Sequence, residues 1–246
     1  MEINSITFNG KNSLDFGLYV SGNQTFNSAE KDYSKVSVPG RSGDLLLFNN
    51  RYKNVNVNYD AILIEDYEKN AEKVRSWLLS ANGYCRLEDT YHPDEFRMAS
   101  FSGPVDFDTK MLEAGETTLT FDCKPQRWLK SGENWISCEN GPSGFTATLS
   151  NPTLFESKPL IKLEGYGTIE IGTGIIEIRG DIIDVPTTIY VDCETMNCFY
   201  YDNNSEVPKN ANKYVIISKW PTLLPGDTYV HSNTVGFHIQ PRWWTL

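Results

Sequence analysis

Hydrophobic and polar residues alternate most regularly between residues 55 and 63. Val55, Val57, Tyr59, Ala61 and Leu63 take every second position, and Asn or Asp separates the first four of them. Successive side chains of a strand point to opposite faces of the sheet, so this pattern predicts a half-buried β-strand. Shorter apolar runs predict further strands in the first half of the chain, at residues 6–8, 84–89, 96–101 and 117–123.

One segment has helical periodicity instead. Its apolar residues recur at intervals of three and four positions, namely Tyr67, Ala71, Val74, Trp77, Leu78 and Ala81. Glu65, Asp66 and Glu68 lie where the positive end of the helix dipole would be. Gly83 suits the left-handed position that follows a last helical turn. We therefore predict an α-helix over about residues 65–82.

A different pattern occurs at Leu45, Leu46, Leu47 and Phe48, where four large apolar residues follow one another. A strand with one wet face would alternate, so a continuous apolar run implies cover on both faces. If the chain's own core supplies one cover, a partner must supply the other. The preceding residues 20–36 are mostly polar and are predicted to form an exposed loop, and the glycines and proline of 38–44 predict a sharp turn.

The second half of the chain reads as all-β. Periodicity is lost over residues 124–144, which collect turn-forming residues, so we place the domain boundary near Ser137 to Ser143, with domains at 1–137 and 138–246. Gly172-Thr173-Gly174 between two alternating segments predicts a hairpin. Short strands at regular spacing predict a β-sandwich, with strands at 145–149, 160–164, 168–171, 175–179, 187–191, 198–201, 214–218 and 234–239.

The charge balance narrows the choice of partners. The 246 residues include 22 Lys and Arg against 32 Asp and Glu, which gives a formal net charge of −10. Nucleic-acid grooves and anionic membrane surfaces both require clustered basic residues, so the acidity argues against them. No apolar run approaches the ~18 residues of a membrane span, and the first ten residues lack the layout of a signal peptide. We expect a soluble chain with no membrane insertion and no export signal.

The residues offer little support for catalysis or for a cofactor. The five cysteines show no CxxC spacing and are expected to be reduced thiols. His92, Asp94 and Glu95 could be drawn as a metal or acid–base group, but a turn around Pro93 accounts for them equally well. No nucleophile elbow, phosphate loop or zinc-protease motif occurs. We expect no enzyme, no metal and no cofactor, although a pair of carboxylates for glycoside hydrolysis stays open, because such pairs need no sequence motif.

Trp220, Trp243 and Trp244 allow a second interpretation of the C-terminal half. Indole faces stack on sugar rings, so a β-sandwich carrying three of them could be a carbohydrate-binding module that contributes to host adhesion. Packing is the commoner use of tryptophan. The closing aromatic pair predicts that the chain end docks into the sandwich.

Several short motifs, taken in order, resemble the distal tail proteins of long-tailed, non-contractile bacteriophages. Trp220 stands where the family would have phenylalanine. The likeness covers both halves of the chain and rests on Val38-Pro39-Gly40-Arg41-Ser42-Gly43-Asp44-Leu45, Tyr59, Asn151-Pro152-Thr153, Lys158-Pro159-Leu160-Ile161, Gly165-Tyr166-Gly167, Tyr190-Val191-Asp192-Cys193-Glu194-Thr195, Trp220-Pro221-Thr222-Leu223, Pro225-Gly226 and Pro241-Arg242-Trp243-Trp244.

The resemblance implies a mainly β fold in two domains and a structural role in the virion. The N-terminal domain would be a β-sandwich with one α-helix and an extended belt hairpin, and the C-terminal domain a galectin-like β-sandwich. The length fits the short form of the family, without carbohydrate-binding insertions. Six copies would form a hexameric ring, a distal tail hub that anchors the baseplate or receptor-binding apparatus at the tail tip, after assembly in the host bacterial cytoplasm.

The same resemblance names partners and a surface. The ring would contact the major tail or tail-terminal tube protein, the tail-associated fibre-like protein and the receptor-binding or baseplate proteins, and DNA would pass through its lumen without specific binding. The belt would span residues 36–63, which include the apolar run. The predicted oligomer interface therefore consists of Arg41, Asp44, Leu45, Leu46, Leu47 and Phe48.

Overall fold

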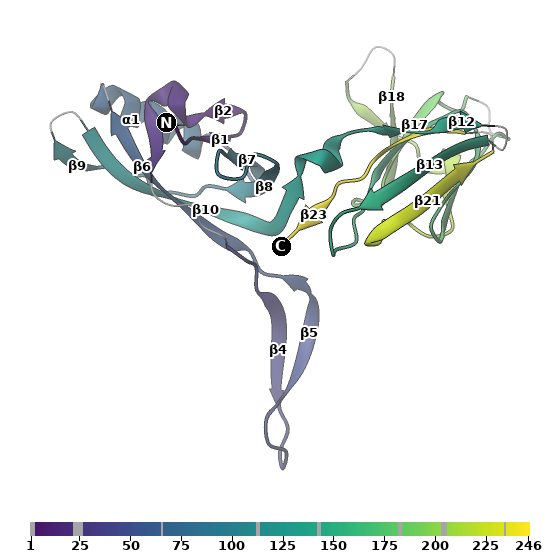
Figure 1. Cartoon of the computed structure of the whole chain (residues 1–246), viewed down its shortest axis with the longest axis horizontal. Helices are drawn as coiled ribbons and strands as arrows, with labels where there is room; N and C mark the ends of the chain where they lie inside the picture. Colours follow the sequence, from purple (N-terminus) through teal and green to yellow (C-terminus); the bar gives the residue numbers. More distant parts are fainter. Residues whose placement is uncertain are drawn as a thin grey trace. The chain divides into compact units, whose positions relative to one another are not determined.

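The computed structural model describes residues 3–21, 27–64, 66–111, 114–141, 144–181, 184–202, 206–233 and 235–246. The chain forms two compact units, Met1–Arg127 together with Leu246, and Trp128–Thr245 (Figure 1). The division falls at Arg127, before the position that the loss of periodicity predicts. The reason is local pairing, because the Leu129 amide donates to the Trp243 carbonyl at 2.9 Å, and the Arg242 amide to the Gly132 carbonyl at 2.8 Å.

The first unit is built on one large antiparallel sheet. Its main path runs β2-β1-β7-β8-β10-β6-β3, and β9 also pairs with β10. The elements are β1 (Ile6–Phe8), β2 (Lys11–Asn12), the 3-10 helix η1 (Ser13–Phe16), β3 (Leu18–Ser21), β4 (Lys31–Ser37), β5 (Asp44–Tyr52), β6 (Val55–Ile64), α1 (Tyr67–Leu79), β7 (Cys85–Asp89), β8 (Glu95–Ser100), β9 (Asp108–Met111) and β10 (Ala114–Leu129).

The predicted alternating strand and the predicted helix are both confirmed in this unit. The alternating residues of β6 point into the core, and β6 pairs with β10 on one side and β3 on the other. Helix α1 buries Ala71, Val74, Trp77 and Leu78. It ends at Leu79, so Gly83, with φ +73, lies beyond the cap rather than in it. The expected start at Glu65 lies outside the described residues.

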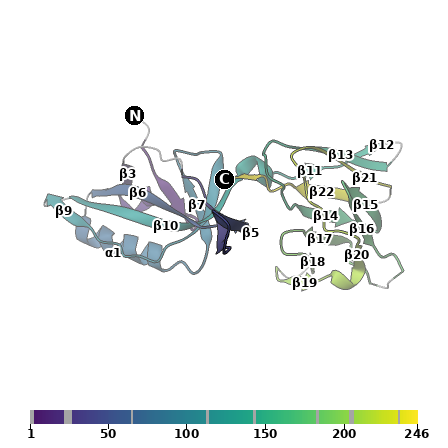
Figure 2. The same ribbon diagram turned by 90° about the horizontal axis from the view of Figure 1, so that it is seen from below.

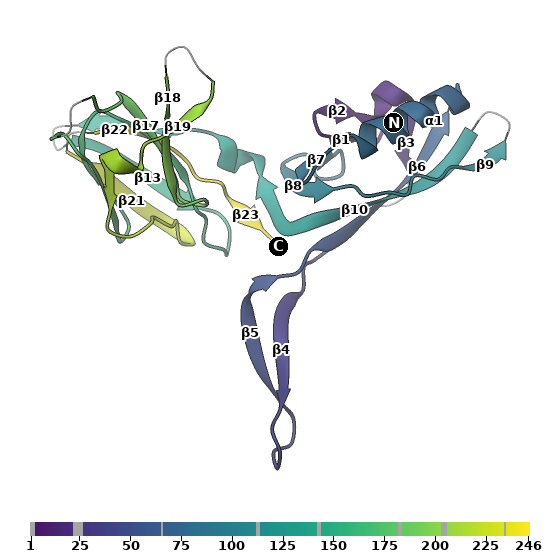
Figure 3. The ribbon, with the colours of Figure 1, turned by 180° about the vertical axis from the view of Figure 1, so that it is seen from behind.

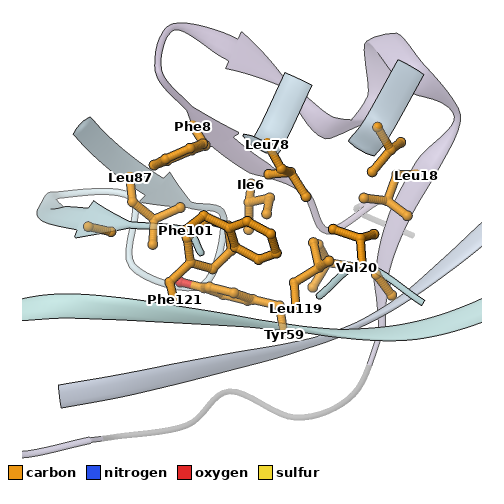
Figure 4. Close-up of a cluster of buried hydrophobic side chains, with 14 of the residues drawn as sticks. Ile6, Phe8, Leu18, Val20, Tyr59, Leu78, Leu87, Phe101, Leu119 and Phe121 are labelled. Carbon is orange, nitrogen blue, oxygen red and sulfur yellow. The ribbon is translucent and has the colours of Figure 1, made fainter. Parts of the chain in front are cut away.

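Aromatic rings fill the centre of this core, as Figure 4 shows. The Phe121 ring lies with its centroid 5.1 Å from those of both Phe8 and Phe101. The helix is attached by Trp77, whose ring stacks on Phe16 and whose Nε1 donates to the Phe8 carbonyl at 3.0 Å. The core thus joins strands that are far apart in the sequence.

Among the described residues, strands β4 and β5 pair only with each other, and they leave the main sheet as a two-stranded ribbon (Figures 1 and 3). Two expectations are corrected here. The stretch predicted as an exposed loop contains β4, and the belt hairpin spans Lys31–Ser37 and Asp44–Tyr52 rather than 36–63. Residues 55–63 belong to the main sheet because their apolar face is buried in the core.

The second unit consists of two six-stranded sheets (Figure 2). One runs β11-β22-β14-β17-β18-β19 and the other β12-β13-β21-β15-β16-β20. The elements are η2 (Lys130–Glu133), β11 (Ile136–Ser137), β12 (Glu139–Gly141), β13 (Gly144–Asn151), β14 (Leu160–Glu164), β15 (Gly167–Ile171), β16 (Gly174–Ile178), β17 (Thr188–Asp192), β18 (Asn197–Tyr201), β19 (Pro208–Asn210), η3 (Asn212–Tyr214), β20 (Val215–Ile217), β21 (Gly226–Ser232), β22 (Gly236–Gln240) and β23 (Trp244–Thr245).

The sequence pattern identifies most strands of this unit but misses β21, which lies inside its sheet between β13 and β15. Its inward positions are Thr228, Val230 and Ser232, all buried. Two of the three are polar, so the apolar alternation that marks a buried face is absent from the sequence. The predicted hairpin is confirmed, because Ile171 pairs with Gly174 across the turn between β15 and β16.

The mainly β, two-domain fold class is therefore confirmed, with a single α-helix in the part of the chain that the structure describes. No helix among those same residues is long and apolar enough to cross a bilayer.

Candidate assembly surface on the hairpin

The tip of the hairpin is a tight turn whose residues suit its geometry. The Arg41 amide donates to the Val38 carbonyl at 3.1 Å, which closes a four-residue turn. Pro39 is favoured at the second position, and Gly40, with φ +79, supplies the left-handed conformation that a type II turn requires at the third. Arg41 and Asp44 lie exposed at this tip.

The register of the two strands sorts their side chains onto two faces. Val36 pairs with Leu45, and Ser34 with Leu47, so these residues share one face. Lys35 pairs with Leu46, and Tyr33 with Phe48, on the other face. The apolar run therefore divides, with Leu45 and Leu47 on one side of the ribbon and Leu46 and Phe48 on the other.

Both faces are open to solvent in the single chain. Leu46 is 55% exposed, Leu47 49%, Leu45 42% and Phe48 41%. Exposed large apolar side chains that gather on one element mark an interaction surface in soluble proteins. The cover that the apolar run requires is thus missing on both faces, not only on one.

Aromatic and charged contacts hold the second of these faces in place. The Phe48 ring centroid lies 5.4 Å from that of Tyr33, and Lys31 Nζ lies 5.8 Å from the Phe48 centroid. Near the base, Arg51 Nε donates to Asp32 Oδ2 at 2.6 Å, and this hydrogen bond holds the pKa of Asp32 below its ordinary value. An isolated two-stranded ribbon is marginally stable in water, so these contacts support the hairpin only in part.

The structure brings Leu45, Leu46, Leu47 and Phe48 onto one ribbon with Arg41 and Asp44 at its end, as the sequence predicts. It adds Tyr33 and Val36 from β4, both more than 40% exposed. Sequence reasoning missed them because β4 lies in a polar stretch. A signal was available in the turn at Pro39-Gly40, which places the preceding residues opposite the apolar run.

No family model and no curated protein matches this chain in the comparisons with known proteins. Among solved structures, it is similar to the SPP1 Dit (gp 19.1) protein, whose structure is described as a paradigm of the hub adsorption apparatus in phages that infect Gram-positive bacteria. The TM-score is 0.68 and the match covers 100% of both chains, at 13% sequence identity.

The chain has the fold of a phage distal tail protein. Full coverage of both chains means that the projecting hairpin and both units fall inside the match. This fold agrees with the family that the ordered motifs resemble.

The other candidate residues serve the fold. His92 Nδ1 lies 3.0 Å from Asp89 Oδ1, and Glu95 Oε2 accepts a hydrogen bond from Arg127 Nη1 at 3.3 Å. Asp94 is exposed on the surface. Within the described residues, no group of three or more histidine, cysteine, aspartate or glutamate side chains is placed to hold a metal ion.

Trp220, Trp243 and Trp244 of the second unit are also used for packing. Trp243 is buried, and Trp220 packs against the second core. Trp244 stacks on Phe155 at a centroid distance of 4.6 Å, and its Nε1 donates to the Glu156 carbonyl at 2.9 Å. The chain end is docked as predicted up to Trp244, whereas the Leu246 carbonyl accepts a hydrogen bond from Arg127 of the first unit.

Proposed function

We propose that this protein is a structural component of a phage tail tip, a distal hub that closes into a ring of six copies at the end of a non-contractile tail tube. The fold similarity over the whole chain supports the class of protein. The open apolar hairpin supports the assembly, since both of its faces lack cover in the single chain.

The exposed run Leu45, Leu46, Leu47 and Phe48 is the observation that carries the proposal. In a ring, each subunit presents one surface to the neighbour before it and a different surface to the neighbour after it. A hairpin that extends from the body of its own unit is suited to reach such a neighbour. We propose that its two faces are covered there, with Arg41 and Asp44 at the rim of the contact.

The proposed partners follow from the position of such a hub. The ring would contact the tail tube protein on one side and the tail-associated fibre-like protein on the other, and it would carry receptor-binding or baseplate proteins. Its place would be the tail tip of the virion, after assembly in the host cytoplasm. No catalytic activity is part of this proposal.

The acidity of the chain fits a tube through which DNA passes. A lumen lined with carboxylates repels phosphate, and the net charge of −10 supplies the carboxylates. The genome would therefore slide through without specific binding. An electropositive lumen in the assembled ring would contradict this part of the proposal.

Negative-stain imaging and light scattering of the purified protein test the assembly. We expect six-fold rings with the mass of six chains, either for the protein alone at high concentration or after mixing with its tail tube protein. A protein that stays monomeric under both conditions would overturn the ring. Saturable binding on a glycan array with no assembly would favour the carbohydrate-binding alternative instead.

A further inference from the structure

An arginine occupies an inward-facing position in the sheet of the first unit. Arg97 lies on β8 two residues before the buried Ala99, so both side chains point to the face of the sheet that carries the core. Its cross-strand neighbour on β7 is Leu87, which is buried. An apolar residue would be expected at such a position. A guanidinium here needs hydrogen-bond acceptors, because burying an unpaired charge costs free energy.

Within the described residues, the Arg97 Nη1 atom has no hydrogen-bond partner, although the charge of Glu95 lies near enough to favour the charged guanidinium. The same Nη1 atom is sealed from solvent. Burial is the main cause that lowers the pKa of Arg97. Arg127 differs in part, because its Nη1 donates to Glu95 and its Nη2 donates to the Leu246 carbonyl at 2.6 Å, and only its Nε is buried without a partner.

Arg97 lines a cavity of about 210 Å³ at the edge of this core. The strongest acceptor in the cavity is already engaged, because Asp89 accepts hydrogen bonds from the Tyr59 hydroxyl at 2.6 Å and from the His92 amide at 2.7 Å. The cavity is lined by Ser21, Val57, Asn58, Tyr59, Asp60, Asp89, Tyr91, His92, Arg97 and Thr118.

We propose that this cavity binds a carboxylate group, which pairs with Arg97. A guanidinium is a planar fork of donors that matches the two oxygens of a carboxylate. Asp60 and Asp89 also line the cavity, and their charges disfavour a doubly charged phosphate more than a singly charged carboxylate. A free small carboxylate and an Asp or Glu side chain of a second copy are the two sources. The site shares no residue with the hairpin surface, so it stands apart from the proposed function.

Thermal unfolding of the full chain at pH 7 tests the site, with sodium acetate compared against sodium chloride at equal ionic strength. We expect acetate to raise the midpoint of the wild-type protein saturably, because a ligand that binds only the folded state stabilises it. Arg97→Met should weaken acetate binding about tenfold or more. Arg97→Lys keeps the charge but not the planar fork of donors, so its acetate affinity should lie between those of the wild-type protein and Arg97→Met. The control is Arg179→Met, since Arg179 forms an ion pair with Asp181 in the second unit.

A second measurement separates stability from binding. Without acetate, Arg97→Met should be at least as stable as the wild-type protein, because it removes an unpaired buried charge. Saturating acetate should then raise the unfolding midpoint of the wild-type protein more than that of Arg97→Met. The proposal is overturned if acetate shifts neither protein, if it shifts both equally, or if phosphate stabilises the wild-type protein more than acetate does.

Sedimentation velocity identifies the source. If a second copy supplies the carboxylate, acetate should lower the average mass of the wild-type protein, and Arg97→Met should lower it without acetate. If the ligand is a free carboxylate, the mass should stay constant while acetate still raises the unfolding midpoint. Both results support the site. If the hairpin proves not to form a ring interface, both of these expected results for the Arg97 site remain the same.

Discussion

Tyr33 and Phe48 face each other across β4 and β5 with ring centroids 5.4 Å apart, and each side chain is more than 40% exposed. The pair lies on a ribbon that the rest of the described chain leaves uncovered on both faces. Aromatic residues in such positions commonly anchor protein interfaces, where their area is removed from water on binding. We therefore expect Tyr33 and Phe48 to contact another chain.

Replacing Leu46 and Phe48 together by aspartate tests the hairpin. Burying either aspartate in an interface would leave an unpaired charge, so we expect loss of the oligomer, which light scattering would measure. The free energy of unfolding of the single chain should change by about 0.5 kcal/mol or less, because both sites are exposed. Leu154→Asp is the matched control, since Leu154 is 88% exposed in the second unit. An oligomer that survives the double change contradicts the proposed interface.

Phe121→Ala should destabilise the first unit by about 3–5 kcal/mol. Phe121 is fully buried between Phe8 and Phe101, and truncation would leave a cavity in the core. Urea unfolding followed by hydrogen exchange of peptides from each unit would measure the effect. Phe48→Ala, at an exposed site, serves as the control. A similar cost for both phenylalanines would show that the core is misassigned.

Stability of the second unit should depend on pH through Asp192. Arg242 Nη1 donates to Asp192 Oδ1 at 2.7 Å, and Nη2 lies 3.4 Å from Oδ2. Burial raises the pKa of Asp192, but the hydrogen bonds and charge of Arg242 outweigh it and leave the pKa below its ordinary value. The folded pKa is lower than the unfolded one, so this stabilisation is present above about pH 4 and is lost as the pH falls through the folded value.

We expect Asp192→Asn to cost about 1–3 kcal/mol at pH 7, and the difference from the wild-type protein to shrink below about pH 4. Urea unfolding at several pH values gives both quantities. Asp202→Asn is the control, because its ion pair with Lys209 is half exposed and solvent screens it. A cost for Asp192→Asn that is independent of pH would mean that the charge of Asp192 plays no part.

The five thiols should differ in reactivity. All five are free. Burial raises the pKa of Cys123 and Cys193 to about 12 and that of Cys198 to about 11, so few of these groups are thiolates at pH 8. Mass spectrometry after iodoacetamide treatment of the native protein should therefore show labelling at Cys85 and Cys138 first. Labelling of all five at one rate in the native state would contradict the burial.

Sequence reasoning succeeded where one face of an element meets the core. The alternation of β6 and the three- and four-residue spacing of α1 report burial directly, because solvent on one side and core on the other impose the period of the element. The apolar run Leu45 to Phe48 likewise predicts a surface that a partner covers. The mainly β class and the helix were thus readable from residue order alone, and the apolar run stays a predicted interface.

Tertiary structure decided the features whose cause is distant in the sequence. β21 is buried with Thr228 and Ser232 on its inner face, since neighbouring strands enclose it whatever its own residues are. The boundary at Arg127 results from pairing between residues near 130 and the chain end. Arg97 looks like any strand residue in the sequence, and only the folded chain places it on a cavity whose strongest acceptor, Asp89, is already engaged. The local hydrophobic pattern shows which face of an element is buried. Only the folded chain determines which side chains from distant parts of the sequence contact one another at that face.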